Sequence, residues 1–246
     1  MWRSTYLRSL VIGAGAALLT AAHAPPEAMR FVAGPPPLTP DAEARIAVEV
    51  LSRAVRPLSH PLALETAFRA YFAYRASHPE DVRNPYLYFV DFGLPSTEAR
   101  GYVFEMSALT IVDGPFAVAH GRGSADALYG IPTRFSNRIN SEATSLGLYV
   151  ANELYDFRGN ANGRTYTSLG LRLDGLSRDY NDNARARHVV AHGAPYVSAT
   201  IAGLSEGCPA MEPSRAQKLL PKLANGGMVF LFAPDSAWMA SMQSSG

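Results

Sequence analysis

The chain is predicted to fold as a mainly β body behind an N-terminal helical extension, which makes the fold α+β overall. Three observations predict this class. Residues 41–83 carry apolar side chains at helical spacing. From residue 84 onward, short aromatic and β-branched runs alternate with clusters of Gly, Pro, Asn and Ser. The 246 residues are 48% hydrophobic and 17% charged, which is enough apolar material for one sizeable core.

Residues 1–24 have the pattern of a secretory signal peptide. Arg3 and Arg8 precede a short apolar region from Leu10 to Ala22, and Ala22-His23-Ala24 forms an A-x-A cleavage site. The apolar run is too short to span a bilayer comfortably. We therefore expect an exported protein of the periplasm, cell wall or extracellular space, with no stable membrane span after the signal is cleaved.

A proline-rich linker at residues 25–40 precedes the helical extension at residues 41–83. Thr39-Pro40-Asp41 is typical of a helix start, and Pro57 is expected to end this first helix. The second helix is expected from about Pro61 to Ser77, with its apolar side chains on one side.

The β body is expected at residues 84–234. Its strand candidates are Tyr86–Phe92, Arg100–Met106, Phe116–His120, Ser145–Tyr155, Ser168–Leu173, His188–His192 and Met228–Phe232. A helix is predicted over Pro213–Leu220, where Pro221 would end or kink it. Gly159–Gly163 lacks the strand-to-helix setting of a phosphate loop and is interpreted as a plain loop. Residues 235–246 are interpreted as a small, polar tail.

The charge balance disfavours nucleic acid as a partner. Loss of residues 1–24 removes two of the 22 basic residues and none of the 21 acidic ones, which leaves 20 against 21 and a net charge of −1. A nearly neutral chain without a basic run has no electrostatic attraction to a phosphate backbone. Any partner would be bound by local chemistry.

The single cysteine, Cys208, is the strongest candidate for chemistry. An exported chain with one cysteine cannot form an internal disulfide, so the thiol is inert and buried, bridges two molecules, or is reactive. Gly207 permits a tight turn that exposes the thiol, and the neighbouring Ser, Glu, Gly and Pro are unlike a strand interior. This context favours a nucleophile over a small buried hydrophobe, and a nucleophilic thiolate needs a base or a positive neighbour.

His192 is the candidate base, because it ends the apolar run His188–His192 and is followed by Gly193. A zinc pair of His188 and His192 is disfavoured, since residues four apart on a strand lie about 13 Å apart. We expect no metal and no other cofactor. Taken alone, His192 would be interpreted as a core or surface histidine that only forms hydrogen bonds.

The combination of these residues resembles a known catalytic motif. His192-Gly193, a gap of fifteen residues between His192 and Cys208, and Ser205-x-Gly207-Cys208 resemble the motif of the L,D-transpeptidases, the YkuD-like family. The resemblance is closest to the divergent Ser-x-Gly-Cys-Pro-Ala branch of murein L,D-transpeptidase catalytic domain proteins. Weaker matches are Phe135-Ser136-Asn137, Ser141, Ser145-Leu146-Gly147 and Arg187-His188-Val189-Val190.

The resemblance covers roughly Tyr86 to Ala233 and implies a β-sandwich catalytic domain at residues 84–234. Proteins of this family are exported and act on bacterial peptidoglycan. Two positions depart from the family pattern: Glu206 stands where the main family has a second histidine, and Ala210 replaces a polar residue. Glu206 therefore either replaces a substrate contact or faces solvent.

The resemblance also implies a mechanism. His192 would deprotonate Cys208, whose thiolate attacks the carbonyl of the diamino acid at position three of a peptidoglycan stem peptide. A D-amino acid leaves, and a second amine resolves the thioester into a crosslink. The carbonyl of Gly193 would orient the base, and the N–H groups of Gly207 and Cys208 would stabilise the oxyanion. Carbapenems are expected to acylate Cys208.

Other residues could contact the stem peptide. His120-Gly121 is a second His-Gly pair that could line the same cleft, with a simple loop histidine as the alternative. Arg187, Arg134 and Asn137 could bind carboxylates or amides, although surface salt bridges would explain the arginines equally well. Ser205 could form a hydrogen bond near the thiolate or merely shape the turn.

Three alternatives to an L,D-transpeptidase stay open. With water as acceptor, the same Cys-His pair would make an L,D-carboxypeptidase or amidase of stem peptides. A sortase-like transpeptidase also has His, then Cys, then Arg, and Arg215 follows here, but the Gly-Cys-Pro context disfavours it. The third alternative is a catalytically silent wall-binding module on the same fold.

Overall fold

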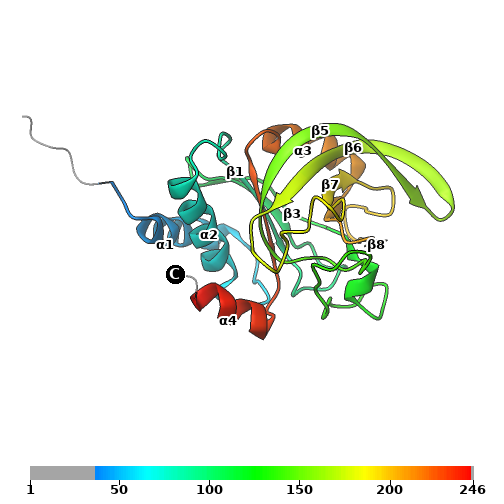
Figure 1. Ribbon diagram of the computed structural model, residues 1–246, viewed down its shortest axis with the longest axis horizontal. Coiled ribbons are helices and arrows are strands. Elements are labelled where there is room, and N and C mark those ends of the chain that lie inside the picture. Colours follow the sequence, from blue (N-terminus) through cyan, green and yellow to red (C-terminus); the bar gives the residue numbers. More distant parts are fainter. Residues whose placement is uncertain (1–36, 245–246) are drawn as a thin grey trace, which may run out of the picture. The chain divides into compact units, whose positions relative to one another are not determined.

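An eight-stranded mixed sheet forms the centre of the fold in a computed structural model that describes residues 37–244 (Figure 1). Its strand order is β3-β2-β1-β10-β5-β6-β7-β9, and a separate small sheet pairs β4 with β8. The strands are β1 (Tyr86–Asp91), β2 (Gly101–Glu105), β3 (Thr110–Phe116), β4 (His120–Gly121), β5 (Gly147–Ala161), β6 (Arg164–Gly175), β7 (Val190–Gly193), β8 (Leu204–Ser205), β9 (Ala210–Met211) and β10 (Met228–Phe232). The predicted class is confirmed. The expected signal peptide and most of the expected linker lie outside the described residues.

Both N-terminal helices are present, close to their predicted bounds. Helix α1 (Pro40–Leu51) begins after Thr39, whose side-chain oxygen accepts a hydrogen bond from the Ala42 N–H at 3.2 Å. It ends before Pro57 through a 3₁₀ turn, Ser52–Ala54. Helix α2 (Ala63–Ser77) packs against α1 and contacts β1, β10 and β5.

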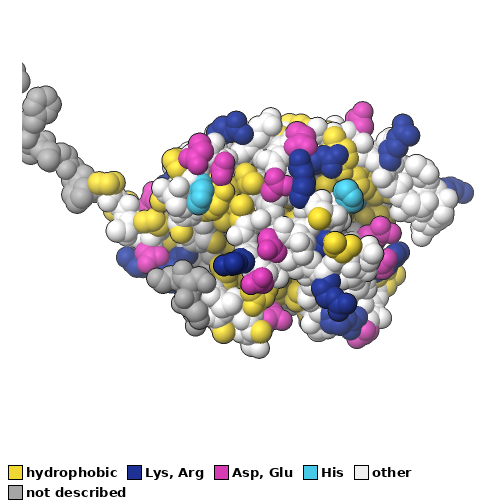
Figure 2. All heavy atoms as spheres, in the orientation of Figure 1, with side chains coloured by type: hydrophobic (Ala, Val, Ile, Leu, Met, Phe, Trp, Pro, Cys, Tyr) yellow, Lys and Arg dark blue, Asp and Glu magenta, His cyan; other side chains and the backbone are white. Residues whose placement is uncertain are grey.

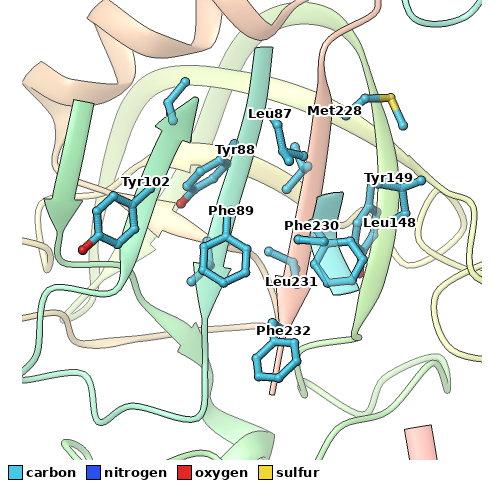
Figure 3. Close-up of a cluster of buried hydrophobic side chains, with 14 of the residues drawn as sticks. Leu87, Tyr88, Phe89, Tyr102, Leu148, Tyr149, Met228, Phe230, Leu231 and Phe232 are labelled. Atoms are coloured by element: carbon cyan, nitrogen blue, oxygen red, sulfur yellow. The ribbon is translucent and has the colours of Figure 1, made fainter. Parts of the chain in front are cut away.

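The core is built around β1 and β10, two parallel neighbours in the middle of the sheet. Every residue of β10 and all but the first of β1 are buried, because helices cover strands that would otherwise expose apolar faces. Figure 3 shows Phe89, Phe230 and Phe232 side by side on these two strands. Helix α3 (Pro213–Leu223) contacts β5, β6, β7 and β1, which completes the cover.

The C-terminal residues contribute to this core. Residues 235–246, interpreted from the sequence as a polar tail, contain helix α4 (Ser236–Ser244). Its Trp238 is fully buried, with its ring 5.9 Å from Phe230 and 5.6 Å from Phe232. Trp238 therefore anchors this helix on β10, and the partly buried Met239 and Met242 also pack against the core.

Two further expectations need correction. The strand expected over Phe116–His120 is only partly formed: β3 ends at Phe116, and β4 begins at His120. The sequence pattern did not predict β3, because this edge strand contains Asp113 and Pro115, and Asp and Pro are rare inside sheets. Helix α3 also continues through Pro221 to Leu223 instead of ending there.

For the longest hairpin of the sheet, the sequence predicted part of each strand but not the turn that joins them. β5 and β6 pair through Ala161 and Arg164, so the two-residue turn is Asn162-Gly163, with φ values of 52° and 75°. These positive angles favour an Asn-Gly turn. The interpretation of Gly159–Gly163 as a plain loop is therefore wrong, because these residues form the end of β5 and the turn. Figure 1 shows the hairpin as a long curved arm.

The described surface is polar and mixed in charge. Figure 2 shows acidic and basic side chains interspersed over the visible face, without an extended area of one sign. No helix among residues 37–244 has both the length and the apolar character needed to cross a bilayer.

Candidate active site

Cys208 lies in a tight turn between β8 and β9. Gly207 has φ +117°, and a Cβ atom there would lie 2.9 Å from the Ala143 carbonyl oxygen, so both the angle and the space favour glycine. Ser205 Oγ donates to the Cys208 carbonyl at 2.7 Å and accepts from the Gly207 N–H at 3.2 Å. Ser205 therefore shapes the turn, which was one of its two expected roles.

One short segment, residues 119–121, holds both ends of this turn. The Ala119 N–H donates to the Ala210 carbonyl at 2.8 Å on one side. On the other side, β4 pairs in parallel with β8, His120 with Leu204 and Gly121 with Ser205. The position of the Cys208 backbone thus depends on this segment.

The Cys208 thiol is half-buried beside the start of β7. Its Sγ lies 3.8 Å from the carbonyl oxygen of His188, a residue held at φ +56°. Burial raises the pKa of this thiol to about 11, although the Val190 N–H and the charge of Arg187 both act to lower it. In the unliganded protein the thiol is therefore protonated at neutral pH.

His192 lies on β7, where it pairs in parallel with Ala210, two residues beyond the cysteine. Its Nδ1 lies 3.0 Å from the Gly193 carbonyl oxygen, which can only accept, so Nδ1 carries the proton and Nε2 is the basic atom. The ring stacks on Phe157 with centroids 4.0 Å apart and is 2% exposed. Burial lowers the pKa of His192 to about 4, so the imidazole is neutral.

The two N–H groups expected to stabilise an oxyanion differ in their availability. The Gly207 N–H already donates to Ser205 Oγ. The Cys208 N–H has no acceptor among the residues that the structure describes. The free N–H of Cys208 is thus the donor that the turn offers to a developing negative charge.

A pocket of about 440 Å³ lies at the end of the β5–β6 hairpin. Its lining comprises Ala161, Asn162, Arg164, Thr165, Tyr166, Pro195 and Tyr196. The rings of Tyr166 and Tyr196 meet edge to face with centroids 6.3 Å apart. The Tyr166 ring also lies 6.0 Å from the ring of Phe157, which stacks on His192, so aromatic contacts connect the pocket to His192. Sequence reasoning missed it, because no local motif links these residues.

Arg187 does not present its side chain to a cleft as expected. Nη1 donates to the Ser136 carbonyl at 2.6 Å, and Nη2 donates to the Ala143 carbonyl at 2.6 Å and to Ser141 Oγ at 3.2 Å. These bonds hold the half-buried guanidinium in place but leave its Nε–H and one Nη1–H unused, so the expected contact with a substrate carboxylate stays a prediction. It fixes the loop that packs against the Cys208 turn.

Asn137 is also used within the protein. Its Nδ2 donates to Asp182 Oδ1 at 2.5 Å, and its Oδ1 accepts from the Asn183 N–H at 3.1 Å. It ties two loops together, so the expected substrate contact would require these bonds to break.

His120 is fully buried and does not reach the surface of the site as expected. Its Nδ1 lies 2.8 Å from Arg100 Nη2, and its Nε2 has no hydrogen-bond partner among residues 37–244. Burial and the neighbouring Arg100 charge lower the pKa of His120 to about 3. His120 thus belongs to the support beneath the turn.

Charged residues surround the mouth of the turn. Exposed Glu206 forms an ion pair with Arg122 at 3.4 Å, and Arg122 also binds Glu142. Arg134 pairs with Asp126 at 2.7 Å on the surface, the salt-bridge alternative that we weighed. Within the described residues, no group of three His, Cys, Asp or Glu side chains is arranged to bind a metal ion.

The sequence profile of the L,D-transpeptidase catalytic domain family matches residues 58–232, more than half of the chain. No curated protein matches the chain.

Solved structures that share similarity include L,D-transpeptidases. One from Mycobacterium smegmatis has 14% identity and a TM-score of 0.36, over 61% of this chain and 59% of that one. One from Mycobacterium tuberculosis H37Rv has 13% identity and a TM-score of 0.34, over 61% and 58%. Bdellovibrio bacteriovorus Bd1075 has 12% identity and a TM-score of 0.37, over 66% and 54%. The chain matches less than two thirds of the length of each.

Proposed function

The chain belongs to the L,D-transpeptidase catalytic domain family, and from this membership we propose that it is an exported peptidoglycan L,D-transpeptidase that works by cysteine acyl transfer. One observation supports the chemistry above all others. Cys208 occupies a glycine turn two residues before Ala210, which pairs with His192 on the neighbouring strand. The Gly193 carbonyl accepts the Nδ1–H of His192, so Nε2 is the basic atom. A nucleophile, a base and a group that orients the base are the parts that acyl transfer requires.

In the proposed reaction, the Cys208 thiol gives its proton to His192 Nε2 while Sγ bonds to the carbonyl carbon of residue three of a stem peptide. The Cys208 N–H donates to the resulting oxyanion. Cleavage of the amide bond releases a D-amino acid, whose amine takes the proton from His192. An amine from a second stem then attacks the thioester, gives its proton back through His192, and leaves a new amide crosslink and a free thiol.

The pocket at the end of the hairpin is where we place part of a stem peptide. Tyr166 and Tyr196 supply aromatic faces, and Asn162 and Thr165 supply polar groups, within a volume suited to a small peptide segment. Water in place of the acceptor amine would make the protein an L,D-carboxypeptidase, which is the second candidate.

A digest of purified muropeptides with tetrapeptide stems tests this proposal. Dimers joined through position three, followed by mass spectrometry and absent with the Cys208→Ala variant, are the expected products. Shortened tripeptide stems without dimers would establish hydrolysis instead. The absence of any Cys208-dependent product would contradict both activities and favour a wall-binding module.

We expect His192→Ala to lower kcat/KM by about 10² to 10⁴-fold, because the variant lacks the general base. The measurement is the initial rate of D-amino acid release. His78→Ala is the matched control, since His78 is exposed, stacks on Tyr74 of α2 and contacts Ser77 Oγ through Nδ1. If His192→Ala costs little while His120→Ala abolishes turnover in a folded protein, the base has been assigned to the wrong histidine.

The acid side of the pH profile should lack the usual histidine limb. The base must be unprotonated, and burial holds the pKa of His192 to about 4, below the ordinary value of about 6.5. We therefore expect kcat/KM to be nearly flat from about pH 5 to about pH 9 and to fall only as the pH approaches 4. A limb centred near pH 6.5 would show that His192 is not held neutral.

A further inference from the structure

The guanidinium of Arg187 carries a charge that no carboxylate balances. All three of its acceptors are neutral: the carbonyls of Ser136 and Ala143 and the hydroxyl of Ser141. Among the described residues it forms no ion pair, whereas its neighbour Arg185 pairs with Glu153 and Asp174. A buried cation held only by dipoles keeps its full charge available to a nearby anion.

This charge lies against the Cys208 turn. A Cβ atom on Gly207 would be 3.4 Å from Arg187 Nη2, so the guanidinium borders the space beside Gly207, the residue immediately before Cys208. The same Nη2 donates to the Ala143 carbonyl, which lies against Gly207 from the same side. The orientation of the guanidinium is therefore fixed by the loop that encloses the turn.

The other groups that face Cys208 do not supply a positive charge. From β7, His192 is buried and neutral. From the turn itself, the exposed carboxylate of Glu206 is repulsive towards a thiolate and is partly neutralised by Arg122. Neutral tyrosine hydroxyls complete the surroundings: Tyr149 and Tyr155 from β5, Tyr166 from β6 and Tyr196 from the loop after β7.

We propose that Arg187 is a positioning residue that stabilises the Cys208 thiolate electrostatically, and that Glu206 opposes it from the solvent side. In the mechanism implied by the family resemblance, His192 alone forms the thiolate by accepting the proton of Cys208. A buried neutral imidazole carries no positive charge until it has accepted that proton. Arg187 supplies a permanent charge instead. This inference rests on the proposed function only in taking Cys208 as the nucleophile.

The test measures the thiol without any substrate. The rate of Cys208 alkylation by iodoacetamide is followed across pH by mass spectrometry in the full chain, in Arg187→Gln, Arg187→Lys and Glu206→Gln, and in Arg185→Gln as the matched control. Only the thiolate reacts, so the rate reports the thiolate fraction. Circular dichroism confirms that each variant is folded.

We expect Arg187→Gln to raise the pKa of Cys208 by about one unit, which lowers the alkylation rate about tenfold at any pH below that pKa. Arg187→Lys keeps the charge and loses the forked hydrogen bonds, so its rate should stay close to that of the unaltered protein. Glu206→Gln should accelerate alkylation about twofold, an effect that high salt abolishes because Glu206 is exposed. Arg185→Gln should change nothing.

An Arg187→Gln profile equal to that of the unaltered protein would overturn the inference. So would an Arg187→Lys variant that is as slow as Arg187→Gln, since the hydrogen bonds and not the charge would then matter. If Arg187→Gln does not fold, the Arg187→Lys profile decides between these roles. A shifted profile in a protein that makes no Cys208-dependent muropeptide product would contradict the proposed function and leave the role of Arg187 intact.

Discussion

Replacing Cys208 with alanine is expected to lower turnover of stem peptides by more than about 10⁴-fold, to the background level. The variant has no atom that can form the thioester. Cys208→Ser should be equally inactive, because a serine hydroxyl is much less acidic than a thiol and His192, with its pKa lowered to about 4, is a weak base. The muropeptide digest provides the measurement, and intact-mass spectra with a carbapenem should show an adduct on the unaltered protein and none on Cys208→Ala.

The fold should survive this change. The Cys208 side chain is half-buried, and its sulfur makes weak contacts with the His188 carbonyl, at 3.8 Å, and with the Val190 N–H, so Cys208→Ala should alter the free energy of unfolding by less than about 1 kcal/mol. Equal urea midpoints for the two proteins are therefore the control. Turnover by a folded Cys208→Ala variant would exclude Cys208 as the nucleophile.

Arg100→Met is expected to be the most destabilising single substitution near the site, by about 3 to 5 kcal/mol. Arg100 is fully buried, and its guanidinium donates to the Val118 carbonyl at 2.7 and 3.1 Å and also to the Leu94 carbonyl. It contacts His120 Nδ1 at 2.8 Å and lies 4.8 Å from the centroid of the Phe92 ring. Methionine fills the space but leaves these acceptors without donors.

The measurement is the urea midpoint of Arg100→Met compared with that of Arg69→Met. Arg69 pairs with Asp41 on an exposed helix surface, so its loss should cost less than about 1 kcal/mol. Arg100→Met should also lower activity, because Arg100 fixes Val118 and His120 at the segment that holds the Cys208 turn. Equal urea midpoints for Arg100→Met and Arg69→Met would show that Arg100 contributes little to the free energy of unfolding.

Sequence patterns predicted the strands whose apolar residues follow one another along the chain. Met228–Phe232 and Tyr86–Asp91 were found because strands buried on both faces are continuous apolar runs. β8 and β9 have two residues each, and only partners distant in the sequence define them. The Asn162-Gly163 turn is different, because an Asn-Gly dipeptide between two strands is itself a sequence signal for a two-residue hairpin turn.

The candidate site divides in the same way. Gly207, Cys208 and Ser205 form one turn, and Gly193 follows His192 directly, so a short motif was enough to propose how they lie. The surroundings of Arg187 and His120 depend on packing against residues 136–143 and on Arg100, which no local pattern encodes. Both residues were therefore expected at a substrate surface, and both are held by the protein itself.

The short pairings around Cys208 separate the stability of the site from that of the whole fold. β8 and β9 are joined to β4, β7 and residue 119 by a few hydrogen bonds, whereas β1 and β10 lie in a continuous aromatic core. Regions held by few bonds open locally at a lower free energy than the core needs to unfold. We therefore expect the turn that holds Cys208 to open at a lower free energy than the core around β1 and β10 needs to unfold. The site could then be lost while the rest of the chain stays folded.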